Sequence, residues 1–243
     1  MNRPYIFCHM ITSIDGKIDG THKSIPARGE NAFDFYQLAF GEDAYYHLDG
    51  WLSGRATSEA AFTKGMQPMI DENAAPVPDG DYIAKTDLTK YYVSIDPSGK
   101  LGWETNSIQY RDTEAHVIEV LTEKASNGYK AMLRSLEISY IIAGEELLDY
   151  EQLLSKLKEQ FKIETLMLGG GGVLNWSFIQ AGFCDEVSML IAPFADGSAQ
   201  THALFQTKEG MTEDIPVAFD LEHVEKRDNG AVWLRYKVIG KVE

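Results

Sequence analysis

Four consecutive glycines between two apolar segments constrain the fold of this chain more than any other feature. Residues 166–175 read LMLGGGGVLN, and the amphipathic positions Phe178 and Ile179 follow. This pattern predicts a buried strand, a turn of bare backbone and a helix. Glycines let a ligand approach the main chain closely, and a helix N-terminus offers unpaired N–H groups to an anion. A phosphate-bearing cofactor is therefore a candidate ligand, and a tight ligand-free connection is the alternative.

Composition narrows the class of protein. The chain has 243 residues, of which 44% are hydrophobic and 24% charged, as expected of a globular protein with a proper core. No stretch reaches the roughly 20 apolar residues of a membrane span. The formal charge of −15 argues against nucleic acid as a partner, because binding its backbone requires clustered Lys and Arg. Any phosphate site must be built locally, from backbone dipoles and a few placed cations.

The N-terminus and the cysteines suggest a cellular location. No basic region followed by an apolar one opens the chain, so we expect no export signal and a cytoplasmic protein. The two cysteines, Cys8 and Cys184, both flank apolar residues, and we expect reduced thiols in the core. Their spacing is not that of metal ligands, so we expect no metal.

Hydrophobic periodicity alternates between the strand and helix periods. Strands are expected at residues 5–13, 50–54, 91–95, 115–121, 139–143, 165–168, 186–192, 217–224 and 231–239. Helices are expected at 30–40, 57–62, 124–136, 150–161 and 173–181, with Thr57 or Ser58 as the cap of the second. Residues 65–90 are expected to form a long irregular excursion. The pattern predicts one α/β domain over residues 1–243, with a mostly parallel mixed sheet, helices on both faces and an antiparallel C-terminal hairpin.

Two strand ends carry polar residues suited to a nucleotide. The segment SGRATS places Gly54, Arg55 and Thr57 between a strand and a helix. There a guanidinium suits a phosphate monoester such as the 2′-phosphate of NADP, and a threonine hydroxyl suits the pyrophosphate. The segment VSIDPSG places Asp96 and Ser98 after another strand, and ligands of open α/β sheets bind beyond such ends. The alternatives are a surface arginine with a capping threonine, and a simple Asp-Pro turn.

Asp15, with Lys17 in the segment SIDGKIDG, is the best acid–base candidate near the N-terminus, and an Asp-Gly turn between strands is the alternative. The six histidines show no metal-ligand spacing, and we expect His9 and His116, which lie in strand patterns, to be packed or satisfied by neighbours. The chain contains no nucleophile elbow and no P-loop. Nothing in these motifs indicates a hydrolase, a kinase or a metalloenzyme.

Taken in order, these segments resemble the reductase domain of bacterial riboflavin biosynthesis, a family with the dihydrofolate-reductase fold. The likeness covers most of the chain. It rests on RPYIFCHMITSIDGKIDG at the N-terminus, SGRATSE, VSIDPSGKL at 93–101, the block at 143–197 that contains GGGGVLN and AGFCDEVSMLIAP, and the pair Leu204-Phe205. The ordered set is more specific than any one of its motifs.

The resemblance implies an NADPH-dependent oxidoreductase that reduces a ribosylamino-pyrimidine phosphate to its ribitylamino form, by hydride transfer to the ribose C1′. It implies that Asp15 lies beside the substrate. It also implies a set of cofactor-binding residues, namely Gly54, Arg55, Thr57, Asp96, Ser98, Gly170, Gly171, Gly172, Val173 and Leu174. Members commonly form dimers, and the apolar residues of the C-terminal hairpin favour a homodimer.

Three departures bear on the substrate. The chain has Gly169 where members usually carry Glu, and residues 36–43 and 65–80 lack the arginines that hold the substrate phosphate. Another small carbonyl or imine substrate, or a non-catalytic nucleotide-binding protein, therefore stays open. A dihydrofolate reductase is a further alternative, but the chain lacks the Leu-Pro-Trp loop of those enzymes and the acidic helix residue that follows it.

Overall fold

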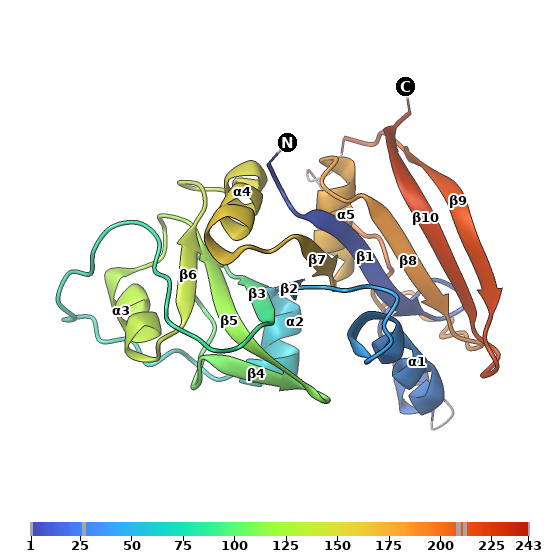
Figure 1. Cartoon of the computed structure of the whole chain (residues 1–243), viewed down its shortest axis with the longest axis horizontal. Coiled ribbons are helices and arrows are strands. Elements are labelled where there is room, and N and C mark those ends of the chain that lie inside the picture. The colour runs from blue at the N-terminus through green and yellow to red at the C-terminus, as the bar shows by residue number, and fades with distance from the viewer. Residues whose placement is uncertain (1, 26–27, 208–209, 211–212, 243) are drawn as a thin grey trace. The chain divides into compact units, whose positions relative to one another are not determined.

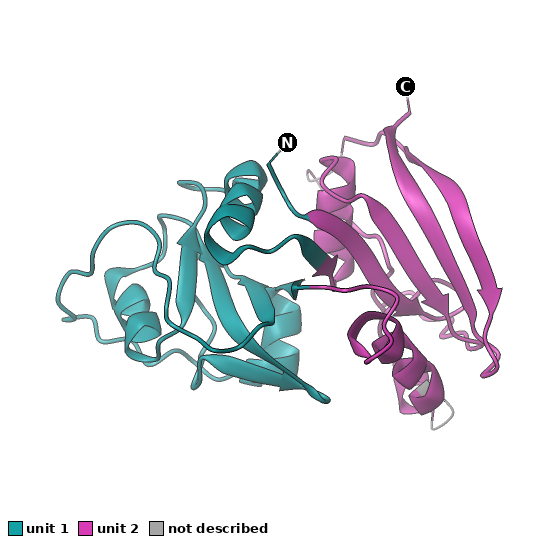
Figure 2. Cartoon of the chain, viewed as in Figure 1, with its two compact units in different colours: residues 1–4, 49–166 teal, residues 5–48, 167–243 magenta. Residues whose placement is uncertain are grey.

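The computed structural model describes residues 2–25, 28–207, 210 and 213–242. The chain divides into two compact units, each made of two segments (Figure 2). Unit 1 comprises residues 1–4 and 49–166, and unit 2 comprises residues 5–48 and 167–243. The α/β class is confirmed, with parallel strand pairs, an antiparallel C-terminal hairpin and helices between the strands (Figure 1). The single-domain assignment stays a prediction.

Unit 1 is built on a group of neighbouring strands. Strand β2 (Gly50–Gly54) pairs in parallel with β3 (Tyr91–Ile95), which pairs in parallel with β5 (Thr113–Leu121). Strand β6 (Ser139–Ile142) is parallel to β5, and β4 (Ser107–Tyr110) is antiparallel to it. Because β2, β3 and β5 are parallel, their carboxyl ends lie at one edge. Strand β7 (Thr165–Leu168) carries the chain onward into unit 2.

The helices of unit 1 follow their local sequence signals. In α3 (Asn127–Ser135), the Ser126 side chain accepts a hydrogen bond from the Tyr129 N–H, which explains a start three residues after the predicted one. In α4 (Tyr150–Phe161), Asp149 is the corresponding cap, and the predicted bounds are confirmed. Its buried face consists of Leu153, Leu154, Leu157 and Phe161, each worth about 1.5–3 kcal/mol of transfer free energy.

The short helix after β2 differs from its prediction. Helix α2 (Arg55–Ser58) has Gly54 as its N-cap, and the π turn η2 (Glu59–Thr63) follows. A cap at Thr57 or Ser58 is therefore wrong. Ser58 is instead buried, with its hydroxyl 2.7 Å from the Tyr92 hydroxyl. The excursion at 65–90 is confirmed as irregular.

Unit 2 carries the opening strand and the C-terminal hairpin. Strand β1 (Tyr5–Thr12) is parallel to β8 (Glu186–Ile191), and β8 is antiparallel to β10 (Val232–Lys241), which pairs with β9 (Val217–Lys226). Three helical segments complete the unit: η1 (Thr21–Ser24), α1 (Arg28–Phe40) and α5 (Gly172–Gln180).

The two strand histidines are satisfied by neighbours within their own units, as predicted. His9 lies 2.8 Å from the Ser188 hydroxyl through Nδ1 and 3.0 Å from the Phe35 carbonyl oxygen through Nε2. His116 Nε2 lies 2.8 Å from the Ser139 hydroxyl. Burial lowers the pKa of each imidazole to about 4, so both rings are neutral at physiological pH.

Candidate functional site

The glycine run places an uncapped helix N-terminus in unit 2. Helix α5 begins at Gly172 directly after the N-cap Gly171, and the first turn has no side-chain cap. The first intrahelical bond runs from the Asn175 N–H to the Gly171 carbonyl, at 3.0 Å. Because a glycine cap has no side-chain acceptor, the amides of Gly172, Val173 and Leu174 can bind an anion. The residues of the predicted phosphate cradle are thus brought together.

Packing also requires glycine in this run. A Cβ on Gly172 would lie 2.2 Å from the Ala203 carbonyl oxygen, because residues 203–206 pass directly over the helix start. The Gln206 N–H donates to the Gly172 carbonyl at 3.2 Å, and Asn175 Nδ2 donates to the Leu204 carbonyl at 3.2 Å. Gly170 has φ +94°, and the Gly170–Gly171 peptide is cis. The close approach of the Ala203 carbonyl oxygen gives Gly172 a structural reason to be glycine, whether or not a ligand binds here.

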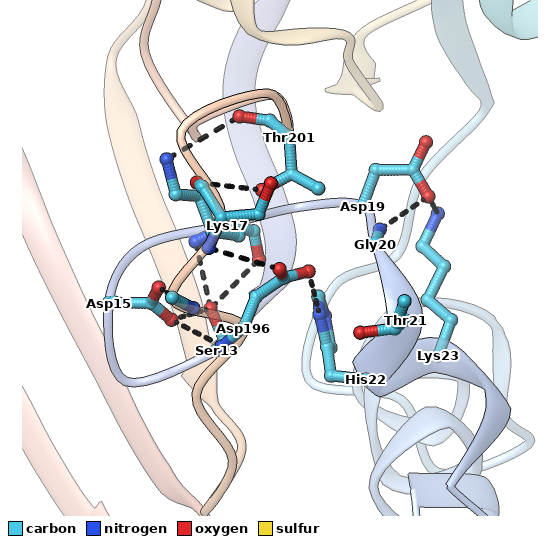
Figure 3. Close-up of polar contacts among 12 residues, drawn as sticks. Ser13, Asp15, Lys17, Asp19, Gly20, Thr21, His22, Lys23, Asp196 and Thr201 are labelled. Atoms are coloured by element: carbon cyan, nitrogen blue, oxygen red, sulfur yellow. Dashed lines mark hydrogen bonds and ion pairs between the residues drawn. The ribbon is translucent and has the colours of Figure 1, made fainter.

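Asp15 holds two loops of unit 2 together (Figure 3). Its carboxylate accepts hydrogen bonds from the Ser13 hydroxyl at 2.6 Å, the Gly197 N–H at 2.9 Å and the Asp196 N–H at 3.1 Å. These three donors hold the pKa of the Asp15 carboxyl well below its usual range. Asp15 is exposed, and its lowered pKa keeps the carboxylate ionised at neutral pH, so it suits a role as a fixed negative charge rather than as a proton donor.

The side chains of His22 and Asp196 meet next to these hydrogen bonds, a contact that the sequence interpretation did not predict (Figure 3). His22 Nδ1 is 3.4 Å from Asp196 Oδ2, and the two side chains are only 1% and 2% exposed. The residues are separated by 174 positions, so their meeting is a product of tertiary structure. The preceding Asp-Gly pair at 19–20 was the only hint, since it marks a turn before His22.

In unit 1, the ends of β2 and β3 bring two predicted residues to adjacent positions. Gly54 pairs with Ile95 in the parallel register, so Arg55 and Asp96 follow the two strands side by side. Arg55 is exposed, and among the described residues its guanidinium has no hydrogen-bond or ion-pair partner. A guanidinium at this position is available to an external anion.

Asp96 is turned into the unit. It is 1% exposed, and its Oδ2 accepts hydrogen bonds from the backbone N–H groups of Lys100 and Leu101, the latter at 2.9 Å. Its Oδ1 has no partner among the described residues. Burial raises the pKa of this carboxyl. Ser98, on the same turn, is exposed. Asp96 therefore braces the 96–101 turn, while Ser98 faces solvent.

The sequence interpretation missed a buried carboxyl group, Glu119 in β5. It is fully buried and accepts hydrogen bonds from the Trp103 indole N–H at 3.0 Å and the Tyr129 hydroxyl at 3.2 Å. Burial, with the nearby Asp96 carboxyl, raises its pKa well above the ordinary value. A glutamate inside the apolar run AHVIEVL was the available signal, because such a residue must be paired or neutral.

A separate groove of unit 2 lies between α1 and the turn joining β9 to β10. It has a volume of about 780 Å³, and Phe33, Asp34 and Arg227 are among its lining residues. The Arg227 guanidinium is engaged by Asp34 at 2.6 and 2.9 Å and also by Glu225. None of the predicted site residues lines this groove, and its arginine is occupied.

Within the ranges that the structure describes, no group of three or more His, Cys, Asp or Glu side chains is arranged to hold a metal ion. Over the same residues, no helix combines the length and apolar character needed to cross a membrane.

Comparison with known proteins gives concordant matches. The model of the family described as RibD C-terminal domain matches residues 4–233. A 2,5-diamino-6-ribosylamino-4(3H)-pyrimidinone 5′-phosphate reductase from Aquifex aeolicus is 25% identical over 204 residues, which are 84% of this chain and 83% of that protein.

Two solved structures share the fold. A pyrimidine reductase-like protein from Corynebacterium diphtheriae aligns with a TM-score of 0.66 and 17% identity, over 98% of this chain and 93% of that one. RibD from Acinetobacter baumannii aligns with a TM-score of 0.63 and 18% identity, over 98% of this chain. The present chain spans only 58% of that RibD chain.

Proposed function

Because this chain belongs to the RibD C-terminal domain family, we propose that it is a 2,5-diamino-6-ribosylamino-4(3H)-pyrimidinone 5′-phosphate reductase that uses NADPH. It is an oxidoreductase of riboflavin biosynthesis with a small-molecule substrate. The observation that carries the proposal is the glycine-capped N-terminus of α5, whose first-turn amides lack a side-chain cap. A dinucleotide pyrophosphate is the ligand that such a terminus suits.

The chemistry of the donor set fits a phosphorylated nicotinamide dinucleotide. Gly171, Gly172, Val173 and Leu174, together with Gly170, would hold the pyrophosphate through backbone N–H groups. Arg55, exposed and without a hydrogen-bond partner among the described residues, would favour the 2′-phosphate and thus NADPH over NADH. Gly54, Thr57 and Ser98 would contribute contacts at the strand ends of unit 1, where Asp96 braces the turn.

When bound, the cofactor would supply a hydride for the sugar C1′, and the residues of the chain would position the substrate. We assign Asp15 to the substrate pocket as a fixed negative charge and hydrogen-bond acceptor. Its three donors keep it ionised, so the proton that the reduction consumes must come from another group or from water.

The residues that depart from the family pattern keep two alternatives open. Gly169 offers no carboxylate, and residues 36–43 offer no guanidinium, so charge-assisted selection of a phosphorylated pyrimidine is weakened. Reduction of a different small carbonyl or imine compound is the first alternative. A nucleotide-binding protein without catalytic activity is the second.

A steady-state assay with purified protein tests the proposed function and its two alternatives. The pyrimidinone phosphate, dihydrofolate and a panel of small carbonyl compounds would each be supplied with NADPH, and its oxidation followed by absorbance. Turnover confined to the pyrimidinone phosphate is expected. Turnover of another compound alone would reassign the substrate, and tight NADPH binding by calorimetry with no turnover would support the non-catalytic reading.

We further propose a homodimer located in the cytoplasm. The hairpin of unit 2 leaves Leu221 and Val224 of β9 and Ile239 of β10 more than half exposed, at 54, 58 and 52%. Exposed apolar side chains on an edge hairpin favour burial against a second copy. A monomeric mass by light scattering at micromolar concentration would contradict the dimer.

A further inference from the structure

The buried His22 side chain contacts a carboxylate in the loop that follows β8. Its Nδ1 lies 3.4 Å from Asp196 Oδ2, and Asp196 Oδ1 accepts a hydrogen bond from the Ser198 N–H at 3.2 Å. Glycine at position 20 makes the approach possible, since a Cβ there would lie 1.6 Å from Asp196 Oδ2. Gly20 also has φ +123°, a conformation that favours glycine. The turn before His22 is therefore shaped around the Asp196 carboxylate.

Asp196 connects this imidazole to the carboxylate of Asp15. The Asp196 side chain accepts from His22, while its backbone N–H donates to Asp15 Oδ1 at 3.1 Å. The next backbone N–H, of Gly197, donates to the other Asp15 oxygen at 2.9 Å. Figure 3 shows His22, Asp196 and Asp15 in this order. By holding the Asp196 side chain, His22 also holds the backbone N–H groups of Asp196 and Gly197, which orient the Asp15 carboxylate.

The hydrogen-bonding role of each His22 ring nitrogen follows from its partners. A carboxylate oxygen accepts hydrogen bonds, so Nδ1 of His22 is the donor in its contact with Asp196. Nε2 is buried and has no hydrogen-bond partner among the described residues. Only the nitrogen nearer the backbone is therefore in use. A role in holding Asp196 needs only Nδ1, whereas a role in binding a ligand directly would need Nε2. Substitutions that keep one nitrogen and remove the other can therefore distinguish the two roles.

We propose that His22 is a positioning residue for the reductase site, which orients the Asp15 carboxylate by clamping Asp196. His22 acts through the 196–197 loop and does not touch the reacting atoms. The effect on turnover rests on the proposed function. The effect on the Asp15 carboxyl group does not, because it is a property of unit 2 alone.

Three substitutions at His22 form a matched series. Asn carries its amide nitrogen on the atom that bears Nδ1 in histidine, so His22→Asn can keep the donor to Asp196. Gln places its nitrogen at the Nε2 position, so His22→Gln loses that donor while staying polar. His22→Phe keeps the ring volume and removes both nitrogens. His47→Phe, at an exposed histidine of the same unit, controls for the loss of an imidazole.

The first measurement is the titration of the Asp15 carboxyl carbon by ¹³C NMR, with the resonance assigned from Asp15→Asn. The wild type, His22→Asn and His47→Phe should keep the pKa of Asp15 well below its ordinary value. In His22→Gln and His22→Phe it should move up toward about 3.9, the value of a free aspartate. An unchanged Asp15 titration in folded His22→Gln would overturn the proposal, and this polar variant serves if His22→Phe does not fold.

The second measurement is kcat and KM with NADPH and the pyrimidinone phosphate. His22→Gln should lose roughly tenfold to hundredfold in kcat/KM through a misplaced Asp15, and His22→Asn should recover most of that loss. Recovery by Gln and not by Asn would overturn the proposal, because it would assign the role to Nε2. If the wild type itself shows no turnover, the proposed function fails, and the NMR series still decides the role of His22.

Discussion

Trp103 donates its indole N–H to the fully buried carboxyl group of Glu119, at 3.0 Å, in the interior of unit 1. The Tyr129 hydroxyl donates to the other oxygen at 3.2 Å. These donors, together with the Ser94 side chain, do not offset the loss of solvation of a carboxylate, so burial raises the pKa of Glu119 well above the ordinary value. Glu119 is therefore a group whose ionisation opposes folding.

The first prediction concerns Glu119→Gln. Because the pKa of Glu119 is raised in the folded state, the folded chain keeps a proton that the unfolded chain releases at a lower pH. The contribution of Glu119 to the free energy of unfolding is therefore complete below the ordinary pKa of Glu and is lost as pH rises through the raised pKa. Glu119→Gln should remove this fall, which is at most about 1.4 kcal/mol per pH unit. Urea unfolding from pH 5 to 9 measures it, with the exposed Glu114→Gln of the same strand as control. Parallel curves for wild type and Glu119→Gln would contradict the assignment.

The second prediction concerns the acid side of the stability profile. Burial lowers the pKa of His9 to about 4, while its ordinary pKa is near 6.5. Between these two pH values the unfolded chain binds a proton at His9 that the folded chain does not bind. The contribution of His9 to the free energy of unfolding should be complete above pH 6.5 and lost as pH falls toward 4. His9→Gln should flatten this part of the profile, and the exposed His47→Gln should not. Equal acid slopes in all three proteins would refute the role of His9.

The third prediction concerns the helix start at Gly172. The added methyl group of Gly172→Ala would lie 2.2 Å from the Ala203 carbonyl oxygen, which belongs to backbone and cannot move alone. We expect a loss of about 1–3 kcal/mol in the free energy of unfolding and weaker NADPH binding. Gly29→Ala, in the first turn of α1 with open space around its Cβ, should instead be stabilising by roughly 0.4–1 kcal/mol. Thermal unfolding and calorimetry test the pair, and equal effects at both sites would contradict it.

The fourth prediction concerns cofactor preference. If Arg55 binds the 2′-phosphate, Arg55→Ala removes a charge-assisted hydrogen bond worth about 1.5–3 kcal/mol. NADPH affinity should fall roughly tenfold to hundredfold, while NADH affinity changes little. Lys85→Ala, at an exposed cation of the same unit, controls for the change in net charge. An unchanged ratio of NADPH to NADH affinity by calorimetry would show that Arg55 has another role.

Local signals were sufficient for most of the elements. Strands β3 and β7 and helix α4 have the bounds that apolar periodicity predicts, because their side chains define a buried face without reference to partners. Strand β4 was missed, since its residues SIQY carry no strong pattern and its identity depends on pairing with β5. Helix α2 starts two residues early because glycine at position 54 serves as its cap.

The sequence by itself determined most of the strands and helices and their order, the glycine turn before α5 and the family to which the ordered motifs point. These depend on residue type and spacing, which act over a few positions. Only the tertiary structure decided that Asp15 is a fully ionised clamp, that Asp96 faces inward and that His22 meets Asp196 across 174 positions. The physical reason is that the charge state and hydrogen bonds of a side chain depend on groups that folding brings from distant parts of the chain.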